Sequence, residues 1–177
     1  NREDEAAAAQ ETTEFLATCL KHISPGVFEA YRRTLIDNNL PSMGHMEYPS
    51  PYDPFDFASF LTFTMFDFYN GPHEDTDANH WTLVIWIPIF NPLTTTDTNP
   101  ILADKDFDML GGQFTFRDFQ VYLDLKEVLG VTVCVFKSKE VTHQTLPGHS
   151  PSGKYTRIGF SCQMSEKMTE AVVAHLN

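Results

Sequence analysis

The chain has 177 residues, of which 42% are hydrophobic and 20% charged, and its formal net charge is −12. This is the composition of one globular domain, which excludes disordered and collagen-like chains and needs neither disulfides nor a structural metal. The longest apolar run, residues 82–90, contains a proline and is far shorter than the roughly 20 residues of a membrane span. Three scattered cysteines without CxxC spacing indicate an intracellular setting, with the nucleus as one alternative.

Acidic side chains are concentrated in the first part of the chain. Residues 1–108 hold 5 basic and 18 acidic side chains, a balance of −13, whereas residues 109–177 hold 7 and 6, a balance of +1. Phosphate neutralisation supplies most non-specific affinity for nucleic acids, so the net charge argues against a large nucleic-acid footprint. A polyanion is therefore expected at the C-terminal part, where Lys137, Lys139 and Lys154 could contact phosphates; a solvated strand edge is the simpler interpretation.

Two helices are expected at the start of the chain. Residues 3–22 combine strong helix formers with apolar residues at helical spacing. Ser24 and Pro25 provide an N-cap and a first-turn proline for a second helix that ends near Asn38. Together they form a helical preface over residues 1–39. Residues 40–57, rich in proline and aromatic residues, are expected to form an extended loop.

Short strands are expected from residue 58 to residue 163. Residues 58–69 carry apolar side chains on both faces, which indicates a strand buried inside a sandwich. Residues 91–110 predict a long functional or mobile loop. Further strands are expected at 82–90, 113–116, 119–125, 131–136 and 155–163, and a closing helix at 164–177. This order predicts a single α+β domain over residues 1–177, with a β-sandwich or jelly-roll core over 58–163.

His73 and Asp75 are the strongest candidates for metal ligands. Two residues apart in an extended segment, their side chains project to the same side. A site with two histidines and one carboxylate on non-haem Fe(II) requires one more histidine. His143 is the best candidate, because it follows the strand at 131–136 by a short turn. A polar surface loop is the alternative, since HxD pairs are common by chance.

Arg157 lies at the head of an apolar strand. An unpaired buried charge is costly, and a bidentate carboxylate partner would offset that cost. The partner is either an internal acid, for instance Asp67, or a bound dicarboxylate cosubstrate. The three candidate metal ligands earlier in the chain favour the cosubstrate.

The order of these elements resembles the Fe(II)/2-oxoglutarate-dependent dioxygenases. More narrowly, it is similar to the TET/JBP-like oxygenases abundant in fungal genomes. The resemblance covers residues 12–166 and includes the five-residue step from Ser138 to His143. It rests on the stretches FLTFTMFDFYNGPHED, TLVIWIPIF, GGQFTF, VTVCVFKSKEVTHQTLPG and YTRIGFSCQ.

The resemblance implies a double-stranded β-helix (jelly-roll, cupin-like) core and an oxidoreductase active site. His73, Asp75 and His143 would be the catalytic residues and hold Fe(II). The cosubstrates would be O2 and 2-oxoglutarate, and the distal carboxylate of 2-oxoglutarate would bind Arg157. The family often has an asparagine six residues before the metal-binding histidine, where it helps to hold the cosubstrate. Asp67 stands there and is the second candidate cofactor-binding residue.

Three functions follow from these observations. By resemblance, the enzyme oxidises the methyl group of a modified nucleobase such as 5-methylcytosine, a step of DNA demethylation that requires base flipping. The alternative is the same chemistry on a small molecule or a protein side chain. The third is a non-catalytic jelly-roll binding module, which the intact triad disfavours. We expect a monomer without a membrane partner.

Overall fold

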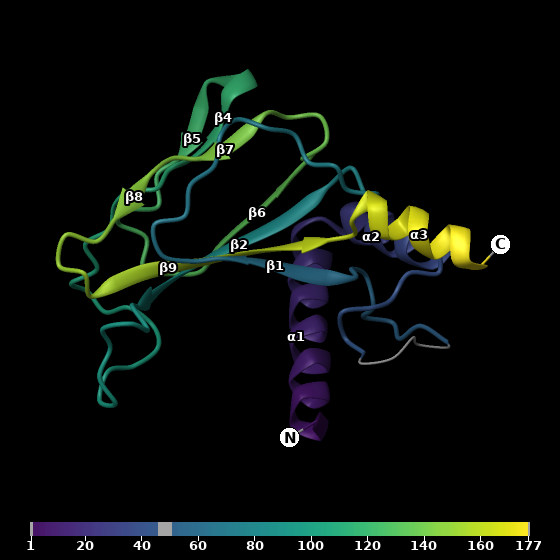
Figure 1. The fold of residues 1–177 in the computed structure, drawn as a ribbon, viewed down its shortest axis with the longest axis horizontal. Coiled ribbons are helices and arrows are strands. Elements are labelled where there is room, and N and C mark those ends of the chain that lie inside the picture. The colour runs from purple at the N-terminus through teal and green to yellow at the C-terminus, as the bar shows by residue number, and fades with distance from the viewer. Residues whose placement is uncertain (1, 46–50, 177) are drawn as a thin grey trace. The chain divides into compact units, whose positions relative to one another are not determined.

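The computed structural model, drawn in Figure 1, describes residues 2–45 and 51–176. The chain divides into two compact units. The first unit comprises residues 1–62, 76–82 and 162–177, and the second comprises residues 63–75 and 83–161. None of the helices in the described residues has the length and apolar character that a membrane crossing requires.

The first unit is built on helices. They are α1 (Arg2–Ile23), α2 (Pro25–Asp37) and α3 (Glu166–Leu176), which confirms the three helices expected from the sequence. Three acidic residues in the first turn of α1 favour its start, and Pro25 occupies the start of α2. The buried face of α2 includes Phe28 and Tyr31, whose rings pack against Phe57.

A buried carboxylate organises the loop that follows α2. Asp56 is 1% exposed and accepts hydrogen bonds from the Ser42 hydroxyl and the Asp53 backbone N–H. His45 Nε2 lies 3.2 Å from Asp56 Oδ2. The side chain of His45 is 31% exposed and supplies one of the polar partners that a buried carboxylate requires. Residues 46–50 of the expected loop lie outside the described residues.

The described residues form nine strands in three sheets. The strands are β1 (Phe60–Thr64), β2 (Thr82–Phe90), β3 (Leu110–Gly111), β4 (Phe114–Phe116), β5 (Val121–Leu123), β6 (Thr132–Phe136), β7 (His143–Thr145), β8 (Gly148–His149) and β9 (Tyr155–Gln163). The sheet orders are β1-β9-β2-β6, β5-β4-β7 and β3-β8. The pairs of β4 with β5, β4 with β7 and β3 with β8 are antiparallel. The fold is thus a mixture of helices and antiparallel sheet.

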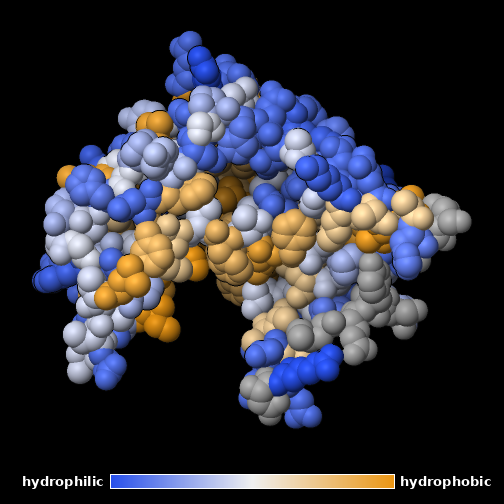
Figure 2. Space-filling model, in the orientation of Figure 1, coloured by the Kyte–Doolittle hydropathy of each residue, from blue (hydrophilic) through white to orange (hydrophobic). Residues whose placement is uncertain are grey.

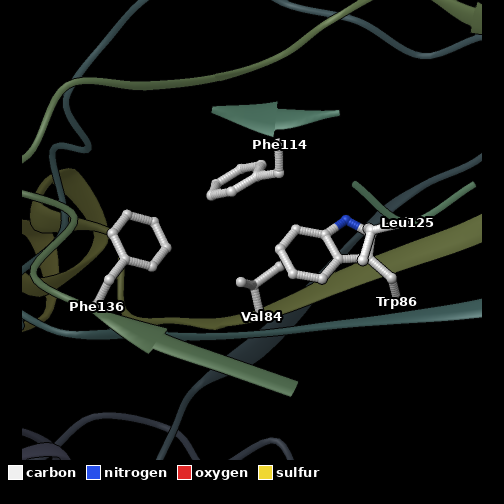
Figure 3. Packing of buried hydrophobic residues seen from close by; sticks show 5 residues of the cluster. All are labelled: Val84, Trp86, Phe114, Leu125 and Phe136. Carbon is white, nitrogen blue, oxygen red and sulfur yellow. The ribbon is translucent and has the colours of Figure 1, made fainter. Parts of the chain in front are cut away.

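The core of the second unit lies between two layers of strands. In Figure 3, Phe114 of β4 faces Trp86 and Val84 of β2 and Phe136 of β6, and Leu125 completes the cluster. The ring centroids of Trp86 and Phe114 are 4.9 Å apart, and those of Phe114 and Phe136 are 5.6 Å apart. Burying such rings is the largest single source of stability available to a domain of this size.

The strand expected over residues 58–69 is only half present. β1 ends at Thr64, and Phe66 adopts a φ of 62°, which lies in the left-handed region and interrupts an extended strand. The expected burial of this strand inside a sandwich was wrong as well, since Phe63, Phe66 and Phe68 are exposed. The apolar alternation in this segment instead produces an aromatic surface.

The long loop after β2 is present as expected. Residues 91–109 contain no helix or strand. Figure 2 shows apolar side chains (orange) on its surface, at the lower left of the view. The exposed apolar residues of this loop are Leu93, Ile101 and Leu102.

Candidate metal centre

The backbones of His73 and His143 are directly paired. The N–H of each residue donates to the carbonyl of the other, at 3.1 and 2.9 Å, which makes an isolated antiparallel bridge. Asn70 extends the pairing, because its N–H donates to Thr145 O and its Oδ1 accepts the Thr145 N–H at 2.6 Å. The segment before β2 is therefore fixed against β7, and the two imidazoles lie side by side with centroids 4.4 Å apart.

Hydrogen bonds set which ring nitrogen of each histidine is free. His73 Nδ1 lies 2.9 Å from Gly71 O, and His143 Nδ1 lies 2.9 Å from Val141 O. A carbonyl oxygen only accepts, so each Nδ1 carries a proton and each neutral imidazole keeps the Nε2 lone pair. Asn70 Nδ2 also approaches His73 Nδ1, but at 3.5 Å this contact is the weaker one.

Asp75 completes the cluster. Its Oδ1 lies 3.6 Å from His73 Nε2 and 3.5 Å from His143 Nε2. The Asp75 backbone N–H donates to Ser138 O, and the buried Ser138 side chain hydrogen-bonds the Asp75 carboxylate. The side chain of His143 is 6% exposed and that of Asp75 15%, whereas that of His73 is 40% exposed. The cluster is thus open to solvent on the His73 side.

The cluster shifts the titration of its own members. Burial alone would raise the pKa of Asp75, but hydrogen bonds from His143 and Ser138 and the neighbouring imidazoles outweigh it and lower that pKa. Burial alone would lower the pKa of His143, but the hydrogen bond with Asp75, the Val141 carbonyl and the negative charge of Asp75 raise it. The three groups therefore attract a positive charge to the space between them.

The donor set fits a divalent transition metal. Among the described residues, His73, Asp75 and His143 form the group that offers three ligand atoms within 4.8 Å of one another. Two imidazole nitrogens and one carboxylate oxygen make up the ligand set of non-haem Fe(II), which leaves further coordination positions open. The structure thus brings together the three side chains that the sequence singled out.

Arg157 has an unsatisfied donor. Its Nη1 donates to Gly112 O at 3.2 Å, but its buried Nη2 has no hydrogen-bond partner in the part of the chain that the structure describes. Burial lowers the pKa of Arg157 to about 10, although Asp124 opposes that effect. The sequence left open an internal salt bridge between Arg157 and Asp67. The structure shows no such ion pair among the described residues, so Nη2 is available to an external acceptor.

A small cavity of about 30 Å³ lies beside Arg157. One water needs roughly 10–15 Å³ by the same measure, so this cavity has room for a small polar group. The lining residues are Thr64, Met65, Phe66, Phe68, Trp86, Met109, Gly112, Thr145, Gly148, Arg157 and Gly159. The three candidate metal ligands are not among them. Phe114 connects the two places, because its ring packs on both His143 and Trp86.

Other residues considered from the sequence lie apart from this cavity. Asp67 is exposed and is not among the lining residues, although both its neighbours are. Phe136 is not among the lining residues either and packs on His143, with ring centroids 4.8 Å apart. The three cysteines are free, as expected.

The comparisons define the class of this protein. The sequence model of the Tet-like 2OG-Fe(II) oxygenase superfamily matches residues 1–148, and the chain belongs to this superfamily. The matched stretch contains His73, Asp75 and His143 but ends before Arg157. No curated protein matches the sequence. The family implies Fe(II) with O2 and 2-oxoglutarate as cosubstrates, and the donor set is compatible with them.

Sequence reasoning missed two residues that support the cluster. Asn70 ties the segment of His73 to β7, and its only sequence signal was its position three residues before the histidine. Ser138 was noted for its spacing alone, whereas the structure places it against the Asp75 carboxylate.

Proposed function

We propose that this protein is an Fe(II)- and 2-oxoglutarate-dependent dioxygenase that oxidises the methyl group of 5-methylcytosine in DNA. The observation that carries the chemistry is the convergence of His73, Asp75 and His143, with both Nε2 atoms turned toward one carboxylate oxygen. The family supports the choice of a methylated nucleobase. Bound Fe(II) and 2-oxoglutarate would supply the oxidising chemistry.

The protein's own residues supply geometry and charge. The Gly71 and Val141 carbonyls accept hydrogen bonds from Nδ1 of His73 and His143, so Nε2 is the ring nitrogen that each histidine would offer to the metal. Asp75 stays ionised because its pKa is lowered. Phe114 and Phe136 pack on His143 and exclude water from its buried side. The exposed side of His73 is the approach for a flipped base.

Arg157 is the residue we assign to the distal carboxylate of 2-oxoglutarate. Its unpartnered Nη2 and the adjacent small cavity support this role. A guanidinium in this setting satisfies its buried donor only when an acceptor binds. Asp67 is solvent-exposed, so a contact with the cosubstrate requires its side chain to turn inward on binding.

The remaining parts of the proposal concern the whole protein. We propose that residues 1–177 act as one monomeric oxygenase domain in which the sheets form a jelly-roll core. A genomic substrate would place the protein in the nucleus.

The test of the proposal is product analysis on DNA. Purified protein, Fe(II) and 2-oxoglutarate are incubated with duplex oligonucleotides that differ only in methylation of one cytosine, and nucleosides are measured by mass spectrometry. The proposal expects oxidised methylcytosine in the methylated duplex, succinate in equal amount, and neither product with His143→Ala. Succinate without any oxidised base would instead favour a small molecule or a protein side chain as substrate.

A further inference from the structure

Trp86 carries an unused hydrogen-bond donor. It lies on β2 within the apolar cluster of Figure 3, where its indole nitrogen is the one polar side-chain atom among the five drawn residues. Its ring packs on Phe114. The indole N–H makes no hydrogen bond with any residue that the structure describes. The side chain is 7% exposed, and its indole N–H can donate to an acceptor that enters from outside the protein.

The N–H edge of Trp86 borders the Arg157 cavity. A Cβ added to Gly159 would lie 3.1 Å from Trp86 Cδ1 and 3.3 Å from Nε1, and 2.6 Å from Thr64 Oγ1. The absence of a side chain at Gly159 thus leaves this edge of the indole uncovered. Gly159 follows Arg157 by two residues on β9, so both positions face the same side of the strand.

The cavity therefore presents donors in excess of acceptors. Arg157 Nη2 is a buried donor without a partner among the described residues, Trp86 contributes an indole N–H to the same lining, and none of the lining residues is acidic. The carbonyls of Gly112 and Gly159 already accept hydrogen bonds from Arg157 and Thr64. A buried charged donor beside a second N–H donor, with no acidic side chain in the lining, favours an anionic acceptor.

We propose that Trp86 is a second binding residue for the cosubstrate, with its indole N–H donating to one oxygen of the distal carboxylate while Arg157 Nη2 donates to the other. This inference rests on the proposed function of Arg157. A rigid indole adds direction to the charge of the guanidinium, so the pair selects a diacid of one length over shorter or longer ones.

The test separates binding from turnover. 2-Oxoglutarate is titrated calorimetrically into Mn(II)-loaded protein without oxygen, for the parent, Trp86→Phe and the matched control Trp81→Phe. Phenylalanine keeps an aromatic ring against Phe114 but removes the donor. We expect about 10-fold weaker binding for Trp86→Phe, the size of one lost hydrogen bond to a charged group, with Mn(II) affinity unchanged. Equal affinities in the two variants would overturn the inference.

A second readout does not depend on the folding of Trp86→Phe. In Zn(II)-loaded Trp81→Phe protein labelled with ¹⁵N, the single remaining indole N–H signal belongs to Trp86. We expect this signal to shift when 2-oxoglutarate is added, and an unmoved signal would contradict the contact. If the parent and Arg157→Lys bind no 2-oxoglutarate at all, the proposed function itself fails. If binding depends on Arg157 but not on Trp86, only this inference fails.

Discussion

Each candidate metal ligand is held in its orientation by a hydrogen bond with a neighbouring residue that is not itself a candidate ligand. Ser138 is the clearest case, because it is fully buried and contacts the Asp75 carboxylate through its side chain and the Asp75 N–H through its carbonyl. We predict that Ser138→Ala lowers Fe(II) affinity by roughly 10- to 100-fold, as for other groups that orient metal ligands. Isothermal titration calorimetry with Fe(II) in the absence of oxygen measures this affinity. Ser152→Ala is the control, and equal affinities in both variants would contradict the role.

Arg157 tests the cosubstrate site. Arg157→Lys replaces a planar fork by a point charge that cannot reach both oxygens of a carboxylate. We predict at least a 10-fold rise in the apparent KM for 2-oxoglutarate, with Fe(II) affinity unchanged. The measurement is succinate formation against 2-oxoglutarate concentration. An unchanged KM would remove Arg157 from the site.

The metal-free cluster should be sensitive to pH. The pKa of His143 is raised in the folded protein, so its protonated form adds stability below the unfolded value of 6.5, and that stability is lost as the pH rises through the folded value. The pKa of Asp75 is lowered, so its contribution is present above 3.8 and lost in acid. We predict that, with chelator present, the parent loses stability as the pH rises above 6.5.

Urea unfolding at each pH measures this loss, and His143→Gln is the comparison because it cannot become charged. The difference between the two proteins should shrink as the pH rises. A difference that is constant over this range would mean that the His143 charge does not stabilise the folded state.

The segment between β1 and His73 has an unusual backbone. Phe66 has a φ of 62°, which is strained for any residue with a side chain, and its N–H donates to Thr156 Oγ1. We predict that Phe66→Gly is more stable than Phe66→Ala by about 1 kcal/mol, the reverse of the usual order, because glycine adopts this φ freely. Thermal unfolding of the two variants measures the difference. An alanine variant as stable as the glycine variant would show that the backbone relaxes to negative φ.

The sequence predicted those elements whose signal lies within the element itself. The bounds of β9 and β2 match because each strand carries a nine-residue pattern with buried apolar side chains. β7 was missed because His143, Gln144 and Thr145 are polar and too few to show alternation. Its existence depends on pairing with β4 and with the segment of His73, which are distant in sequence.

The candidate site could likewise be predicted from the sequence only in part. The HxD pattern and a resemblance identified the three metal-ligand candidates, because residue type carries that chemistry. The contacts of Asn70 and Ser138 were not predictable, since they depend on register between segments that are far apart. The contact of His45 with Asp56 could not be predicted for the same reason.

The charge of the whole chain limits how DNA can bind. With a net charge of −12, contact is expected on the basic C-terminal part. We predict that changing Lys137, Lys139 and Lys154 together to glutamate abolishes turnover of a methylated duplex but leaves 2-oxoglutarate consumption without DNA intact. The matched control changes Lys105, Lys126 and Lys167 in the same way and alters net charge equally. Equal loss in both variants would mean that overall charge, and not this surface, governs turnover.

The most direct test of the central claim is whether the three ligand candidates support Fe(II)-dependent turnover of 2-oxoglutarate. Succinate is measured after incubation with 2-oxoglutarate and oxygen, with and without Fe(II), for the parent and for His73→Ala, Asp75→Ala and His143→Ala. The account predicts that the parent forms succinate only when Fe(II) is added. It predicts that none of the three variants forms succinate. Succinate formation that persists in all three variants, or its absence from the parent even with methylated DNA present, would contradict the account.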